Sequence, residues 1–94
     1  MDFQTFKASL SESHPPASLK PHLKALWFDG KQDWEMSHNI AQDIADDNGS
    51  WIHAYLHRKE GDAGNAGYWY RRAKKPFPQV SLDKEWEELV KALL

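Results

Sequence analysis

The chain contains no cysteine among its 94 residues, which excludes disulfide bonds and thiolate chemistry. It also lacks an apolar run approaching the roughly 20 residues that a membrane-spanning helix requires. The formal net charge is only −2, so the composition does not carry the basic signature of a nucleic-acid-binding domain. Its first residues show neither the basic nor the apolar part of a signal peptide. We therefore expect a cytoplasmic protein with no membrane partner, for which nucleic acid is not the expected ligand.

Large aromatic side chains are what the chain offers for building a core. It has five Trp, three Tyr and four Phe, and each such ring buries roughly 150–250 Å². No segment shows the two-residue alternation of a half-buried strand, whereas several show apolar residues three and four apart, as in amphipathic helices. The sequence therefore predicts one all-α domain over residues 1–94.

Capping residues and helix breakers predict where the helices begin and end. A run of Asp, Asn and Gly at positions 47–49 predicts a turn between the third and fourth helices. The expected N-cap residues are Asp2, Ser18, Asp33, Ser50, Asp62 and Ser81. The expected helices cover residues 2–10, 18–28, 34–46, 51–60, 63–73 and 82–94.

An internal repeat relates the middle helices at an offset of 29 residues, which aligns Ala25 with Ala54 and Asp33 with Asp62. Each unit consists of a helix, a tight turn with Gly and Asp, and a second helix. Two unrelated amphipathic hairpins can also look alike at this level of similarity. On the repeat interpretation, a hairpin at about 18–46 stacks on one at about 50–73, because neither buries its apolar face alone.

The second unit carries a more specific pattern: a Gly-Asp turn, a pair of small residues, an aromatic residue and a closing alanine. These residues are Gly61, Asp62, Ala66, Gly67, Tyr70 and Ala73. This order resembles the second helix of tetratricopeptide and Sel1-like repeats. The resemblance extends over about residues 25–77 and is weaker in the first unit, where Ser37 and His38 replace the small pair. It implies two stacked antiparallel helical hairpins, with N- and C-terminal capping helices, that serve as a protein-interaction scaffold. The whole chain is also similar to a short conserved bacterial protein, a likeness that implies no mechanism.

His53 and His57 lie four residues apart and therefore share one face of the expected helix. A pair at this spacing can bind one metal ion, as in the zinc-protease helix, but the glutamate that follows the first histidine there is Ala54 here. A metal site would need a third ligand, such as His38, Glu60 or an acid from a neighbouring helix. The alternative is a solvated or groove-lining pair. We therefore expect no cofactor, and a divalent metal ion bound by these histidines is the alternative.

Arg58 and Lys59 fall inside the apolar arc of the same helix, where charged side chains are rarely buried without a partner. We favour pairing with acids, for which Asp43, Asp46 and Asp62 are candidates. The other interpretation makes Arg58 an anchor for a phosphate or carboxylate ligand.

Aromatic and basic residues also adjoin one another at positions 68–75, as in surfaces that bind single-stranded nucleic acid. We favour instead the interpretation that these cations complement the C-terminal end of a helix dipole. The leading functional hypothesis is a small module that binds a protein or peptide. Its expected binding residues are Trp51, His53, His57, Arg58 and Tyr68.

The alternative hypothesis is a metal- or small-anion-binding site on His53, His57 and Arg58, with His38 as the third metal ligand. No catalytic residue is predicted, and a role without catalysis is favoured. The sequence leaves the partner and the oligomeric state open.

Overall fold

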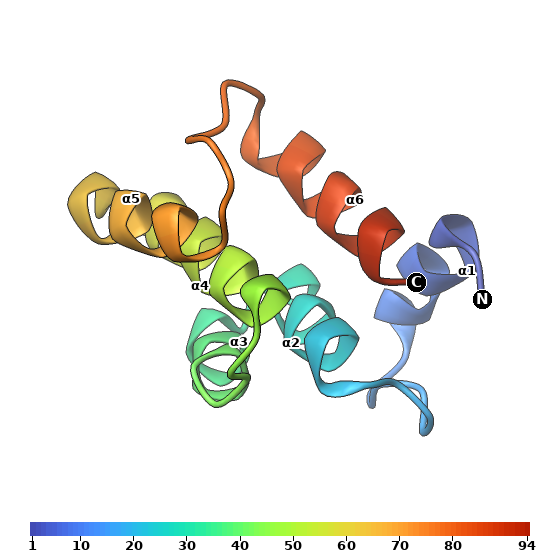
Figure 1. The fold of residues 1–94 in the computed structure, drawn as a ribbon. Coiled ribbons are helices and arrows are strands. Elements are labelled where there is room, and N and C mark those ends of the chain that lie inside the picture. The colour runs from blue at the N-terminus through green and yellow to red at the C-terminus, as the bar shows by residue number, and fades with distance from the viewer.

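The computed structural model describes all 94 residues as six α-helices and one short 3₁₀ helix, with no strand (Figure 1). The expected all-α class is therefore confirmed. None of the helices is both long enough and apolar enough to cross a membrane. The elements are α1 (Phe3–Ala8), η1 (Ser9–Ser11), α2 (Pro21–Gly30), α3 (Trp34–Ala41), α4 (Asp47–Lys59), α5 (Ala63–Arg72) and α6 (Leu82–Leu93).

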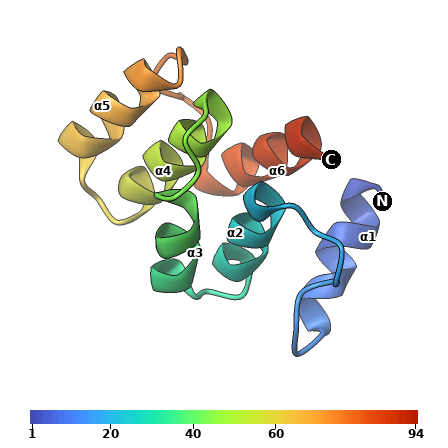
Figure 2. The ribbon, with the colours of Figure 1, turned by 60° about the horizontal axis from the view of Figure 1, so that its bottom comes forward.

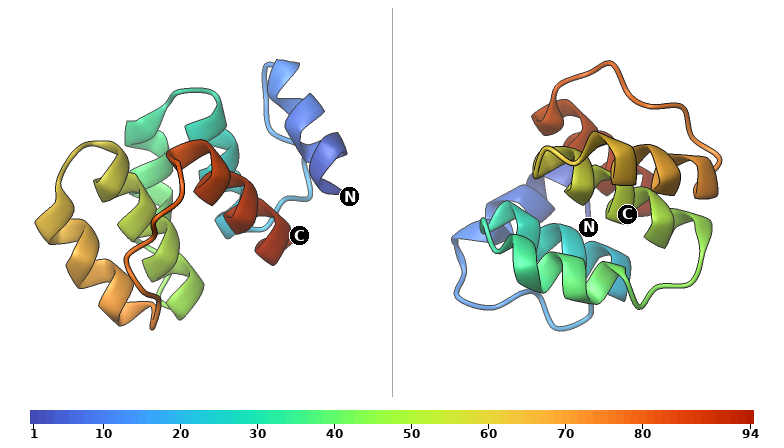
Figure 3. Two further views of the ribbon diagram at one scale, coloured as in Figure 1. Left: turned by 90° about the horizontal axis from the view of Figure 1, so that it is seen from above. Right: turned by 90° about the vertical axis from the view of Figure 1, so that its left-hand side faces the viewer.

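The main core lies where α2, α4 and α6 pack together, with α1 against α6 on one side (Figures 1 and 2). Helix α5 packs on α4 at the opposite end of the molecule from α1, as Figures 1 and 3 show. A smaller cluster of Ala54, Ala66 and Tyr70 joins these two helices. The main core consists of Phe6, Leu23, Ala25, Leu26, Trp27, Ala41, Ile52, Tyr55, Leu56, Leu89, Val90 and Leu93.

The α2–α3 and α4–α5 turns share one backbone geometry. In each, the amide of the capping aspartate, Asp33 or Asp62, donates to the carbonyl five residues earlier, with an N···O distance of 2.9 Å. The residue before each aspartate has a positive φ, 65° at Gln32 and 89° at Gly61. Only glycine adopts this region without steric cost, so Gly61 suits its turn better than Gln32 suits the equivalent turn of the first unit. The 29-residue offset therefore relates equivalent positions in the two turns.

The third helix is shorter than predicted, because α3 ends at Ala41 rather than near residue 46. The expected turn at 47–49 is also wrong, since these residues form the first turn of α4. The N-cap of α4 is Asp46, whose carboxylate accepts a hydrogen bond from the Gly49 amide at 2.7 Å, and not Ser50. Two candidate caps stood four residues apart, and the earlier one adds a full turn to the helix.

The start of α2 also differs from the prediction. The helix begins at Pro21, with Lys20 in the N-cap position, whereas Ser18 lies in the preceding turn. Proline is suited to the first helical position because its missing N–H would have no intrahelical partner there. The hairpins consequently span residues 21–41 and 47–72 rather than about 18–46 and 50–73. The N-caps predicted at Asp2, Asp33, Asp62 and Ser81 are confirmed.

Candidate metal site

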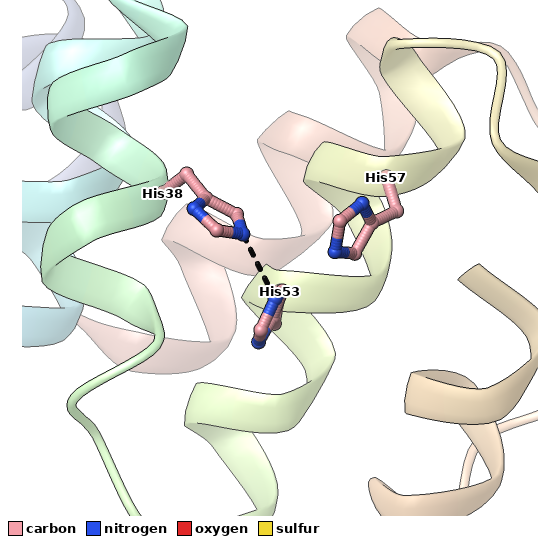
Figure 4. Close-up of side chains that lie close together, drawn as sticks. All are labelled: His38, His53 and His57. Carbon is pink, nitrogen blue, oxygen red and sulfur yellow. Dashed lines mark hydrogen bonds between the residues drawn. The ribbon is translucent and has the colours of Figure 1, made fainter. Parts of the chain in front are cut away.

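Three imidazole rings from two helices converge on one side of α4 (Figure 4). His38 comes from α3, and His53 and His57 come from α4. One ring nitrogen from each of the three lies within 4.8 Å of the other two. The closest pair is His38 Nε2 and His53 Nε2, 3.0 Å apart. The structure therefore brings together the three residues that the sequence analysis proposed as metal ligands.

Helical spacing explains the pairing of the two α4 ligands. His53 and His57 are one turn apart, and their rings stack with centroids 4.8 Å apart and planes 26° apart. His38 approaches this pair edge-on, with ring planes 81° and 73° from theirs. The three rings thus surround a common space instead of forming one stack.

Trp34 positions His38 across the interface between α3 and α4. Its indole Nε1 donates to the carbonyl of Leu56 at 2.8 Å, which ties the start of α3 to α4. The same ring stacks on His38 one turn later, with centroids 4.8 Å apart and planes 10° apart. The orientation of His38 is therefore set by a packed aromatic neighbour.

Helix α5 covers the other side of the cluster through Trp69. Its ring stacks on His53 at a centroid distance of 4.0 Å and an interplanar angle of 20°. His53 and His57 are buried, with 7% and 8% of their surface exposed, whereas His38 is partly exposed. The cluster is thus enclosed by two indoles and reaches solvent at His38.

Glu60 determines which nitrogen of His57 is free to act as a ligand. Its carboxylate oxygen Oε1 lies 2.6 Å from His57 Nδ1, so the hydrogen on Nδ1 is donated to the carboxylate. The lone pair of a neutral His57 then resides on Nε2. A carboxylate that accepts a hydrogen bond from the second ring nitrogen is the usual outer-shell support of a metal-binding histidine.

Burial favours the neutral, ligand-competent form of the other two histidines. The pKa of His53 is lowered to about 4, first by burial and then by the neighbouring His38 and His57. Burial also lowers the pKa of His38, as does His57, while Glu60 acts in the opposite direction. A metal ligand must offer an unprotonated nitrogen, so this environment prepares both rings for coordination near neutral pH.

The distance between the His38 and His53 nitrogens is close to that in a tetrahedral metal centre. Metal–nitrogen bonds of about 2.0–2.1 Å at tetrahedral angles separate ligand nitrogens by about 3.3 Å. The His38 and His53 nitrogens are already 3.0 Å apart, and one nitrogen of His57 lies within 4.8 Å of both residues' ligand atoms. Imidazole ligands suit zinc, copper, nickel and iron, and do not favour calcium or magnesium.

Arg58 lies outside this cluster and is paired with a buried carboxylate. Its guanidinium donates to Glu85 Oε1 at 2.8 Å and also to the carbonyl of Val80. Lys59 donates to Asp29 at 2.9 Å. The predicted structural pairing of both cations is therefore confirmed, although neither partner is among the acids that the sequence analysis considered. The anion-anchor role of Arg58 has no support in this arrangement.

Sequence reasoning missed the two buried carboxylates, Glu85 and Asp29, each only 1% exposed. Each also accepts a hydrogen bond from a tyrosine hydroxyl at 2.6 Å, from Tyr70 and Tyr55 respectively. A signal was present for Glu85, because it shares a stripe at four-residue spacing with the core residue Leu89 on α6. Charged residues at core positions of a pattern indicate partners elsewhere in the chain.

The other two predicted binding residues lie at separate places. Trp51 is partly buried, and its Nε1 donates to Glu85 at 3.2 Å. Tyr68 is 45% exposed on α5, where its hydroxyl accepts a hydrogen bond from Arg72 at 3.2 Å. The five proposed binding residues thus occupy three locations: the histidine cluster, the surroundings of Glu85 and the outer side of α5.

Comparison of the chain with protein-family models, with curated proteins and with solved structures found no match. The geometry of its own side chains is therefore the basis for assigning a function.

Proposed function

We propose that the protein binds a divalent transition-metal ion through the imidazoles of His38, His53 and His57. The observation that carries the proposal is the convergence of three ring nitrogens, all within 4.8 Å of one another, from two helices. Two histidines on one helix are common without a metal, whereas a third ring from another helix supplies the minimum ligand set of a zinc site.

The surroundings of the cluster support the same proposal. Two of the imidazoles are biased toward the neutral form, and Glu60 orients the third through a bond of 2.6 Å. His38 and His53 face each other through Nε2 atoms, so one hydrogen must lie between the two nitrogens. A metal ion would replace that hydrogen and bind both nitrogens at once.

Metal titration of the chelator-stripped protein tests the proposal. Isothermal calorimetry with Zn²⁺ and with Co²⁺ should show one ion bound per chain. His38→Ala and His53→Ala should each weaken binding by at least the 10–100-fold that loss of an outer-shell partner costs. His14→Ala is the matched control, because His14 is an exposed histidine in the connection before α2, and it should bind like the wild type. Failure to bind, or equal binding by His53→Ala, would refute the metal site.

We also propose that the two helical hairpins stack as in tetratricopeptide and Sel1-like repeats, with α1 and α6 as caps, and serve as a scaffold for a protein or peptide. Support comes from the turn geometry that recurs at the 29-residue offset. Tyr68 with Arg72 on the outside of α5 adds a surface of the aromatic and arginine type that often anchors interfaces.

Selection of peptides from a display library on the purified protein tests this second function. Peptides that use the α5 surface should lose at least tenfold in affinity with Tyr68→Ala. Met36→Ala is the matched control, since Met36 is a comparably exposed apolar residue on α3. Equal affinity of every selected peptide for the wild type and Tyr68→Ala would contradict a role for this surface.

A further inference from the structure

We infer that the metal centre is of the open type, with one coordination position left for water or a small anion. The inference rests on the proposed binding of a metal by His38, His53 and His57 and adds a ligand class to it. Structural zinc sites are closed by four protein ligands, whereas sites that bind exogenous ligands have three. The question is therefore whether this chain supplies a fourth donor.

The two acids that approach His57, namely Glu60 and Asp62, are both engaged elsewhere. Glu60 Oε1 is bonded to His57 Nδ1, on the outer side of that ring. The Asp62 carboxylate caps α5 by accepting from the Asn65 amide and side chain, each at 3.2 Å. These acids form a group with His57 but are not part of the three-histidine group. No fourth imidazole or carboxylate is therefore preorganised at the histidine cluster.

The aromatic neighbours cannot take the fourth position either. An indole offers a single N–H donor and no lone pair to a metal. Trp34 uses its N–H on the Leu56 carbonyl, and Trp69 lies flat on His53. These two rings enclose the cluster and so restrict the size of any further ligand. The partly exposed His38 leaves the approach to the open position on its own side.

Charge then selects the class of ligand. Three neutral imidazoles leave both positive charges of a divalent ion on the centre, and the nearest carboxylate is outside the ligand set. A site of this kind, half enclosed by apolar rings, favours an anion over a neutral donor of the same size. We therefore assign hydroxide, azide and similarly small inorganic anions as the ligands of the fourth position.

Cobalt substitution with azide as the probe tests the inference separately from metal binding itself. The visible absorption bands of Co²⁺ report its coordination and change when a ligand enters. The Co²⁺-loaded protein should show a saturable spectral change with millimolar azide. His14→Ala should respond in the same way, because His14 lies outside the cluster.

The outcomes are distinguishable. If no Co²⁺ bands appear, the metal site itself is refuted, and this inference with it. If Co²⁺ bands appear but azide leaves them unchanged, the metal site stands and the open position is refuted. A response to azide that appears only in Glu60→Gln would show that Glu60 moves from His57 to close the site, which also overturns the inference.

Discussion

Acid should destabilise the metal-free protein through His53, over the pH range between its unfolded and folded pKa values. In the folded protein, burial and the neighbouring His38 and His57 lower the pKa of His53 from 6.5 to about 4. The unfolded chain therefore binds a proton near pH 6.5 that the folded chain accepts only near pH 4. Between these values the unfolded state holds more protons, so the free energy of unfolding decreases as the pH falls.

The size of the effect follows from the shift. Each pKa unit corresponds to about 1.4 kcal/mol, so the full loss through His53 is about 3 kcal/mol. It should be absent above about pH 7 and complete below about pH 4. A domain of this size has a total stability of roughly 5–15 kcal/mol, so the loss is readily measurable.

Urea unfolding followed by tryptophan fluorescence, in the presence of a chelator, measures this dependence between pH 7 and pH 4. His53→Phe keeps an aromatic ring against Trp69 and removes the titrating group. Between pH 6 and pH 5, the free energy of unfolding of this variant should depend less on pH than that of the wild type. The difference in slope should be about 1.4 kcal/mol per pH unit. The exposed His14 provides the control variant His14→Gln, which should keep the wild-type slope. An unchanged slope in His53→Phe would refute the reasoning.

Three further predictions concern residues that shape α4, and urea unfolding at pH 7 tests each. Arg58→Met should cost about 3–5 kcal/mol, because it leaves the buried carboxylate of Glu85 without a cation, and adding Glu85→Gln should recover part of this loss. Asp46→Ala should lower the free energy of unfolding by about 1 kcal/mol through loss of the α4 N-cap. A loss below about 0.3 kcal/mol would contradict the assignment of Asp46 as the cap. Gly49→Ala should cost about 1–3 kcal/mol because its Cβ would lie 2.3 Å from a backbone oxygen. Gly64→Ala, whose Cβ meets nothing closer than 4.0 Å, should not destabilise.

Local signals in the sequence predicted most helix ends correctly. The capping aspartates Asp2, Asp33 and Asp62 act within three residues of themselves, so their effect is readable without knowledge of the fold. The prediction failed between the third and fourth helices, where Asp46 and Ser50 were both competent caps. A Cβ at residue 49 would lie 2.3 Å from the carbonyl oxygen of Ile44, so the first turn of α4 packs against residue 44 in a way that only a glycine accommodates.

Long-range polar partners were not predictable in the same way. The positions of Arg58 and Lys59 within an apolar arc predicted that both would pair with acids. Their partners, Glu85 and Asp29, lie 27 and 30 residues away in the sequence. A pattern along one helix specifies which side chains need a partner. It does not specify which distant helix will supply the partner, because that depends on how the helices cross.

The sequence by itself determined that the protein is all-α and that His53 and His57 share one helix face. These features depend on hydrophobic periodicity, capping and the helical repeat, all of which act over a few residues. Only the tertiary structure decided that His38 joins the pair while Arg58 does not. That outcome depends on Trp34, whose bond to the Leu56 carbonyl fixes α3 against α4 and brings the third imidazole within reach of the other two.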